Sequence, residues 1–347
     1  MNKILIYGAY GYTGRLIIDQ FLSQGIKPLI AGRNKEKTMA LGDEKGLEAE
    51  GFDLAETDKL NAWLGKGAVV IHCAGPFSHT AKQMLDACIE TKTHYLDITG
   101  EYEVLDLAQS FDNKAKEAGI MVMPGAGFDV VPSDCLAAHL YAQMPDATHL
   151  ELAFVNKGSR LSRGTAKTMI EGIGKKQAYR KDGKYAYNKS GHEVKEIDFG
   201  EFKQISMAIP WGDISTAYFS TGIPNIQVYL GSDKNQIGQA RKAASLGFLL
   251  KLGFVQNFLK KQIDKKPAGP SDEKRAGAKT YMWGKVSNGD KEIEARIVAP
   301  DGYTLTALTT VSIANKVTAD QFTAGYQTPS TAYGKDLILE VDGCEWG

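Results

Sequence analysis

The sequence predicts an α/β protein: a Rossmann-type doubly wound parallel sheet followed by a second, α+β region that is rich in strands. Three observations support this. Strand-like and helix-like segments alternate from Lys3 to Met123. A glycine-rich stretch joins the first strand to the first helix. From Thr148 onward, strand-like segments follow one another more closely. Regular alternation is typical of a parallel sheet covered by helices on both faces.

The first strand, the glycine turn and the first helix together predict a dinucleotide-binding site. The apolar run ends at Gly8, and Gly11 and Gly14 follow. Gly8 permits a turn that a Cβ would obstruct, Gly11 lets backbone approach a pyrophosphate, and Gly14 lets the helix lie close to the strand. A helix N-terminus attracts phosphate. The spacing G-x-x-G-x-x-G is weak evidence by itself, and a structural turn without ligand is the alternative. The predicted contacts are Gly8, Tyr10, Gly11, Tyr12, Thr13 and Gly14.

The end of the second strand, residues 26–33, favours NADP over NAD. An NAD site carries an acidic residue there, about 20 residues after the glycines, to bind the ribose 2′-OH. This chain has Gly32 and Arg33 instead. A carboxylate would repel a 2′-phosphate, whereas a guanidinium binds it through two N–H donors. The alternative is that Arg33 is a solvated loop charge.

Further strands and helices complete a six-strand, Rossmann-type pattern with ligands at the carboxyl ends of its strands. Asp53 and Leu54 follow the third strand and are predicted to contact the adenine. The small residues of the segment Ala74-Gly75-Pro76-Phe77 would let backbone approach the cofactor. The predicted strands are 47–52, 68–73, 94–98 and 120–123, and the predicted helices are 13–24, 57–64, 80–91 and 103–118.

The second region is predicted to be rich in strands. Asp182-Gly183 marks the turn of a hairpin over residues 180–190. We expect helices at 135–143, 236–264 and 305–317, strands at 150–155, 204–209, 217–221, 226–230 and 292–298, a solvated loop at 265–279 and a closing strand or tail at 337–341.

The helical stretch 236–264 has an apolar face wide enough to need cover on more than one side. Its two stripes are Phe248, Leu252, Val255 and Leu259, and beside them Leu250, Phe254 and Phe258. We expect a domain or subunit interface here. A wall for an apolar substrate and a contact with a membrane surface are the alternatives.

Bulk composition describes an ordinary soluble protein. The 347 residues include 41 Lys and Arg and 41 Asp and Glu, so nothing in the net charge indicates a nucleic-acid or anionic-membrane partner. Four cysteines show no metal-ligand spacing, and we expect free thiols and no metal. No apolar run is long enough to span a bilayer, and the first strand begins too early for a signal peptide. These features predict a cytoplasmic protein that acts on a small molecule.

Taken in order, the motifs resemble those of the saccharopine dehydrogenase-like NAD(P)-binding oxidoreductases. The motifs are residues 8–14 (GAYGYTG), 31–33 (AGR), 74–77 (AGPF), 95–101 (YLDITGE), 127–134 (GFDVVPSD), 210–213 (PWGD) and 327–334 (QTPSTAYG). The resemblance implies an NADP-binding domain, a mixed-sheet second domain that joins a homodimer, and a C-terminal segment that returns to the first domain. We place these parts at residues 1–146, 147–319 and 320–347.

Within this family the chain looks closer to the trans-acting enoyl reductase-like branch than to true saccharopine reductases. The loop Gly127–Asp134 differs from the Gly-Leu-Asp-Pro-Gly form of the latter. A dicarboxylic amino acid would also require clustered Arg side chains. Residues 150–235 offer only Arg160, Arg163 and Arg180.

The catalytic candidates are acids in loops expected near the carboxyl edge of the sheet or facing it. Asp129, Glu101 and Asp213 come first, followed by Tyr95, His79 and Ser133. Each acid has a structural alternative. Glu101 could cap the next helix, Asp129 could hold its own glycine loop in place, and Asp213 could order the turn at Trp211 and Gly212.

These features predict an NADP-dependent reductase of an enoyl/acyl-type or imine-type substrate. The alternatives are a true saccharopine reductase that acts on a secondary amine and a non-catalytic NADP-binding sensor or scaffold.

Overall fold

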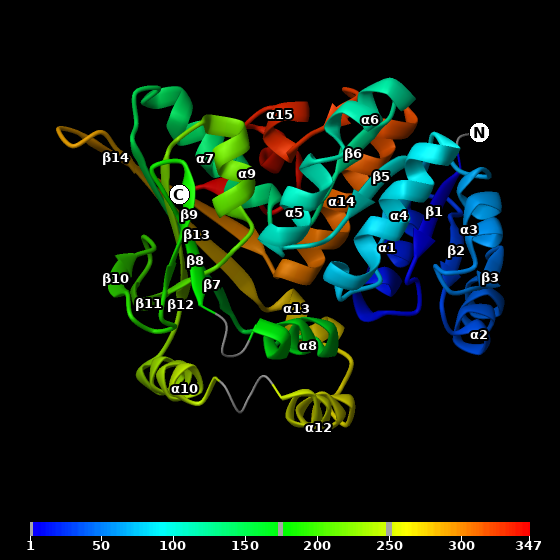
Figure 1. Ribbon diagram of the computed structural model, residues 1–347, viewed down its shortest axis with the longest axis horizontal. Coiled ribbons are helices and arrows are strands. Elements are labelled where there is room, and N and C mark those ends of the chain that lie inside the picture. Colours follow the sequence, from blue (N-terminus) through cyan, green and yellow to red (C-terminus); the bar gives the residue numbers. More distant parts are fainter. Residues whose placement is uncertain (1–2, 173–175, 248–251) are drawn as a thin grey trace. The chain divides into compact units, whose positions relative to one another are not determined.

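The structure is a computed structural model that describes residues 3–172, 176–247 and 252–347 (Figure 1). The chain divides into two compact units. Unit 1 comprises residues 1–131 and 303–332, and unit 2 comprises residues 132–302 and 333–347. Residues 303–318 of the helix that starts at Gly302 belong to unit 1, and residues 132–146 belong to unit 2.

Unit 1 contains a parallel sheet of seven strands in the order β15-β6-β5-β4-β1-β2-β3. The order reverses at β1, as in doubly wound sheets, so the predicted fold class is confirmed. The C-terminal segment supplies the seventh strand. The strands are β1 (Ile4–Tyr7), β2 (Leu29–Gly32), β3 (Ala49–Gly51), β4 (Val69–His72), β5 (His94–Asp97), β6 (Met121–Met123) and β15 (Gly325–Tyr326).

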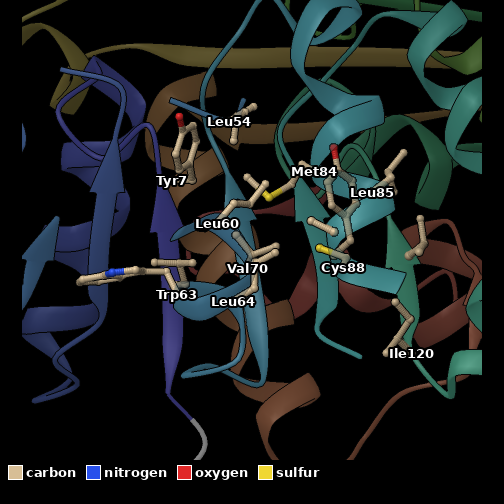
Figure 2. Close-up of a cluster of buried hydrophobic side chains, with 14 of the residues drawn as sticks. Tyr7, Leu54, Leu60, Trp63, Leu64, Val70, Met84, Leu85, Cys88 and Ile120 are labelled. Carbon is tan, nitrogen blue, oxygen red and sulfur yellow. The ribbon is translucent and has the colours of Figure 1, made fainter. Parts of the chain in front are cut away.

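Helices connect these strands and bury their apolar faces against the sheet. They are α1 (Tyr12–Ser23), α2 (Lys35–Lys45), α3 (Thr57–Leu64), α4 (Phe77–Thr91), α5 (Tyr102–Gln109), α6 (Asp112–Ala118) and α14 (Gly302–Thr318). One core cluster joins β1 and β4 to α3 and α4 through Tyr7, Leu60, Val70 and Met84 (Figure 2). The strands are therefore held rigidly where their carboxyl ends meet the loops.

Unit 2 contains a mixed sheet of nine strands, seven of them in the order β10-β11-β12-β7-β13-β14-β16. Among the described strands of this sheet, only β12 and β7 pair in parallel, and the hairpin β8–β9 pairs with β12 through β8. The strands are β7 (His149–Lys157), β8 (Gln177–Lys181), β9 (Lys184–Asn188), β10 (Val194–Asp198), β11 (Lys203–Ile209), β12 (Asn225–Gly231), β13 (Lys279–Ser287), β14 (Glu292–Pro300) and β16 (Glu345–Trp346).

The helices of unit 2 correct several expectations. They are α7 (Val131–Gln143), whose first residue belongs to unit 1, α8 (Arg163–Gly172), α9 (Asp213–Thr221), α10 (Lys234–Ser245), α12 (Gly253–Asp264), α13 (Asp272–Ala276) and the 3₁₀ turn η1 (Leu337–Glu340). The short helix α15 (Pro329–Tyr333) belongs to unit 1 except for Tyr333. The predicted strand 217–221 is wrong, because α9 runs through it and ends at Gly222, whose φ of 72° terminates the helix. The closing segment is 3₁₀, and β13 begins where a loop was expected to end.

The predicted helical stretch 236–264 holds two described helices. Asp233 and Gln236 form a capping box that starts α10. Phe254 and Phe258 of helix α12 are exposed to solvent, although the sequence predicted that another surface covers them. Phe248 and Leu250, which completed the predicted stripes, lie outside the described residues. Among the residues that are described, no helix has the length and apolar character needed to cross a membrane.

Candidate functional site

The glycine turn of unit 1 depends on two glycines that have no room for a side chain. Gly8 has a φ of +86°, and a Cβ there would lie 2.7 Å from the backbone nitrogen of Ala74. A Cβ on Gly14 would lie 2.8 Å from the carbonyl oxygens of Gly8 and Ala9. The turn therefore brings the end of β1 against the loop after β4 and sets α1 close to the strand. Gly11, between them, donates its N–H to the carbonyl of Gly8 at 3.0 Å.

The N-terminus of α1 suits an anion. The first N–H groups of a helix lack acceptors within the helix, and the N-cap residue Gly11 supplies no side-chain acceptor. Tyrosines flank this end. The ring of Tyr10 packs over Gly32, so that a Cβ added to Gly32 would lie 2.7 Å from Cε1 of Tyr10. Tyr12 packs edge-on against Tyr303, with ring centroids 5.1 Å apart. Thr13 belongs to the first turn of α1.

Cations gather at the carboxyl end of β2. Arg33, Lys35 and Lys37 are all exposed, and within the described residues the side chain of Arg33 forms no ion pair. The Nζ of Lys37 lies 6.0 Å from the centre of the Tyr10 ring. Asn34 caps α2 by accepting the N–H of Lys37 at 2.9 Å. The position predicted for the 2′-phosphate thus carries positive charge close to the glycine turn.

The loops after β3 and β4 differ in what they leave accessible. Asp53 is half-buried and accepts the N–H of Ala55 at 3.0 Å, whereas Leu54 is only 6% exposed and packs in the core (Figure 2). Ala74 and its neighbours Gly75 and Pro76 are partly or fully exposed, but the side chain of Phe77 is buried. Leu54 and Phe77 could therefore meet a cofactor only through their backbone.

Glu101 caps a helix, though not the one that the sequence indicated. Its two carboxylate oxygens accept the N–H groups of Phe77 at 3.2 Å and Ser78 at 3.3 Å, the first turn of α4. Pro76, the N-cap residue of α4, provides no side-chain acceptor. Glu101 itself precedes α5 without a side-chain capping bond. The carboxylate thus neutralises the N-terminus of α4 from the neighbouring strand end.

Asp129 lies beside this carboxylate. A Cβ on Gly100 would lie 2.8 Å from Oδ2 of Asp129, so the acid rests against the backbone of the 99–101 loop. Burial, and to a smaller extent the negative charge of Glu101, together raise the pKa of Asp129 from 3.8 to about 7. The structure therefore brings two of the three predicted acids together. A pKa near 7 is suited to proton transfer at neutral pH.

A third carboxylate, Asp97, fastens the loops that carry these acids. Its Oδ1 accepts the N–H groups of Thr99 at 2.9 Å and Gly125 at 2.8 Å, and its Oδ2 accepts the hydroxyl of Tyr95 at 2.5 Å. Burial raises the pKa of Asp97 to about 6, against the lowering effect of these hydrogen bonds. Asp97 is not among the site residues predicted from the sequence. Tyr95, which is, is fully buried, and its hydroxyl donates to Asp97.

Helix α14 holds the loop of Asp129 from the other side. Thr306 accepts the N–H of Phe128 at 3.0 Å, and Thr309 and Thr310 donate to the carbonyl of Ala126 at 2.9 and 3.1 Å. A Cβ on Gly127 would lie 2.7 Å from the methyl group of Thr306. Nothing in the local sequence could identify these partners, because they are about 180 residues away.

The remaining candidates lie on other elements. Asp213 is buried in the first turn of α9 in unit 2. His79 is exposed on α4. Ser133 and Asp134 were expected to precede their helix, but α7 already begins at Val131, so both lie inside its first turn. Asp134 accepts the hydroxyl of Ser220 at 2.8 Å.

Comparison with known proteins agrees with this geometry. Residues 4–123 match the family model of the saccharopine dehydrogenase NADP-binding domain. A rat saccharopine dehydrogenase-like oxidoreductase is 27% identical over 206 residues, or 52% of this chain and 48% of that protein. A trans-acting enoyl reductase of Mycobacterium ulcerans is 28% identical over 166 residues, or 44% of this chain and 39% of that protein. The chain therefore spans about half the length of the curated relatives it matches, or less.

Solved structures share the fold at low sequence identity. Apo saccharopine dehydrogenase (L-Glu forming) from Saccharomyces cerevisiae superposes with a TM-score of 0.68 at 15% identity, covering 100% of both chains. Homospermidine synthase from Legionella pneumophila, in complex with NAD, gives a TM-score of 0.61 at 13% identity, covering 100% of this chain and 91% of that one.

The parallel sheet, its glycine turn and the cations after β2 define a dinucleotide-binding protein. The match of residues 4–123 to the model of the saccharopine dehydrogenase NADP-binding domain agrees with this class. The predicted cofactor, NADP, is thereby confirmed at the level of the domain family.

Proposed function

We propose that the chain is an NADP-dependent oxidoreductase that reduces an enoyl/acyl-type or imine-type substrate. The observation that carries the proposal is the position of Asp129 at the carboxyl edge of the dinucleotide-binding sheet, with a pKa of about 7. The family match of residues 4–123 supports the cofactor. The names of the relatives, an oxidoreductase and a reductase, support the reaction class.

Each group at the edge of the sheet has a distinct part in this proposal. When bound, NADPH supplies a hydride from its nicotinamide ring. The backbone of Gly8, Gly11 and the first turn of α1 would hold the pyrophosphate, and Arg33 the 2′-phosphate. Protonated Asp129 would donate a proton to the substrate atom next to the one that accepts the hydride. That atom is a carbon in an enoyl substrate and the nitrogen in an imine. Burial, together with the negative charge of Glu101, favours the protonated form of Asp129.

The arginines of unit 2 favour an acyl-type substrate over saccharopine. Arg180 is buried, and its guanidinium donates to the carbonyls of Ile214 at 2.6 Å and Gly183 at 2.8 Å. Arg163 donates to the carbonyl of Asp264 at 3.2 Å. Of the three arginines in residues 150–235, two are thus occupied by backbone. A dicarboxylic amino acid would need such groups free to bind its carboxylates.

The competing proposal is a sensor or scaffold that binds NADP without turnover. Its support is that Glu101, one of the few acids at the edge, already serves as a helix cap. The two functions separate in one experiment. NADPH oxidation would be followed with panels of enoyl thioesters and imines, and NADP⁺ reduction with a panel of saccharopine-type amines, using wild type and Asp129→Asn. We expect turnover on one panel, with kcat lowered by more than about tenfold in Asp129→Asn and NADPH binding intact. Equal turnover in both proteins would reject Asp129 as the proton donor. No turnover on any panel, with tight NADPH binding, would favour the sensor.

The choice of cofactor has a test of its own. Arg33→Asp should weaken NADPH binding by more than about tenfold and leave NADH binding within a few-fold, because the new carboxylate repels the 2′-phosphate but can bind a ribose hydroxyl. Intrinsic fluorescence titration with both nucleotides measures this. Lys27→Asp, at an exposed position just before the same strand, is the matched control and should change neither affinity. Unchanged NADPH affinity in Arg33→Asp would place the phosphate elsewhere.

We also propose that the protein is a homodimer located in the cytoplasm. The first part follows from the family resemblance, and light scattering of the purified chain at several concentrations would test it. A monomer at all concentrations would reject it.

A further inference from the structure

Helix α12 in unit 2 presents two phenylalanines to solvent. Phe254 is 73% exposed and Phe258 is 61% exposed. They are four residues apart, so they lie on the same face of the helix, one turn after the other. Leu252, the N-cap residue of α12, is 42% exposed as well. Large aromatic side chains this accessible, repeated along one helix face, mark a surface that another body covers.

The opposite face of α12 is already occupied, so the phenylalanine face is the outer one. Ile263, about half a turn around from Phe254 in helical projection, is buried. Helix α8 packs against α12 (Figure 1). Lys167 of α8 forms an ion pair with Asp264 at 2.5 Å, and Arg163 donates to the carbonyl of Asp264 at 3.2 Å. The helix is thereby anchored to its own unit while its outer face stays open. Met169 of α8 adds a further side chain that is 51% exposed.

Positive charge continues the phenylalanine face toward the C-terminal end of α12. Lys261 and Lys265 follow Phe254 and Phe258 by seven residues each, so they lie on the same side of the helix. Both are exposed. Residues 252–279 hold seven Lys and Arg against three Asp and Glu, in a chain whose net charge is zero. Two of these acids, Asp264 and Asp272, are already paired with Lys167 and Arg275. The surface around the phenylalanines is therefore basic.

We propose that α12 binds the surface of an anionic lipid bilayer, with Phe254 and Phe258 inserted among the acyl chains and Lys261 and Lys265 at the headgroups. Aromatic side chains followed by lysines on one helix face are the pattern of interfacial helices. A second copy of this chain would place the same positive charges against each other, which is unfavourable. A membrane surface supplies the opposite charge and the apolar interior together. The net charge of zero is compatible with this partner, because positive charge is concentrated in residues 252–279.

Vesicle co-sedimentation of the full chain tests the proposal. We expect wild type to sediment with vesicles of phosphatidylcholine and phosphatidylglycerol, and about tenfold less with phosphatidylcholine alone. High salt should reduce the binding. Phe254→Ser with Phe258→Ser, and separately Lys261→Glu with Lys265→Glu, should each weaken binding to the anionic vesicles by at least about tenfold. Both pairs are exposed, so circular dichroism should show an unchanged fold.

The control carries the same charge change elsewhere. Lys27→Glu with Lys291→Glu alters two exposed lysines outside this surface and should bind like wild type. Absence of wild-type binding to anionic vesicles would overturn the proposal, as would equal binding by the phenylalanine variant. Light scattering of that variant provides a further test: conversion of a wild-type dimer to a monomer would identify α12 as an interface between copies and also overturn it. None of these outcomes depends on NADP.

Discussion

The loops at one edge of the unit 1 sheet are held in place by two different physical means. The glycine turn after β1 is set by the absence of side chains, because a Cβ at Gly8 would strike the backbone of Ala74. The loops after β5 and β6 are set by the presence of side chains, because Asp97 and Thr306 supply acceptors for their backbone N–H groups. The first kind of constraint is steric, whereas the second is polar. We therefore expect mutations in the glycine turn and mutations in the loops after β5 and β6 to have different effects on stability.

The largest effect is expected at the turn. Gly8→Val places a branched side chain at a φ of +86° and against backbone that cannot move aside. We expect the free energy of unfolding to fall by about 4 kcal/mol or more and NADPH binding to be lost. Urea denaturation and fluorescence titration measure both.

A matched glycine separates the two causes. Gly25 has a similar φ of +74° but open space around it. Gly25→Val therefore suffers only the conformational strain, about 1–3 kcal/mol, and should keep NADPH affinity. Equal losses at the two positions would mean that the contact with Ala74 contributes nothing.

The next effect is expected at Asp97. Asp97→Ala leaves the N–H groups of Thr99 and Gly125 and the hydroxyl of Tyr95 without this acceptor in a buried site. We expect a loss of about 2–4 kcal/mol in unfolding free energy, since each uncompensated buried donor costs about 1–3 kcal/mol. Tyr95→Phe removes only one of the three bonds and should cost about 1 kcal/mol. Differential scanning calorimetry would compare them. If Tyr95→Phe were as damaging as Asp97→Ala, Asp97 would not be the centre of this network.

The smallest effect is a pH dependence. The pKa of Asp129 rises from 3.8 to about 7 on folding, so the native state retains a proton that the unfolded chain releases. The stability associated with this group is present below pH 3.8 and is lost as the pH rises toward 7. Asp129→Asn should therefore lose less stability than wild type between pH 4 and pH 7.5, by about 1–2 kcal/mol after allowance for solvent screening of a half-buried group.

Urea titrations at several pH values would measure this difference. The rate of substrate reduction should also decline in wild type as the pH rises above about 7, because the proton donor is then ionised. Parallel stability curves for the two proteins would show that Asp129 has an ordinary pKa.

Features that depend on neighbouring residues could be predicted from the sequence, whereas features that depend on distant residues could not. The turn, Arg33 and the sheet were predicted, because glycine spacing, charge and apolar runs are local properties. Glu101 was predicted to be a possible cap of the helix that follows it, but it caps α4 instead. The sequence could not indicate this, because the first turn of α4 is more than 20 residues away in the chain. It predicted a strand at 217–221 because the apolar residues there fit either structure, and the αL conformation of Gly222 ended a helix instead.

By itself, the sequence determined that this chain has a dinucleotide-binding sheet and that its second strand ends in positive charge. These features follow from side-chain size, charge and periodicity. Only the tertiary structure decided that Asp129 rests beside Glu101, that Asp97 and three threonines of α14 hold its loop, and that the phenylalanines of α12 face outward. Those facts arise from burial and from hydrogen bonds between segments distant in the chain, and a pattern along the chain does not contain them.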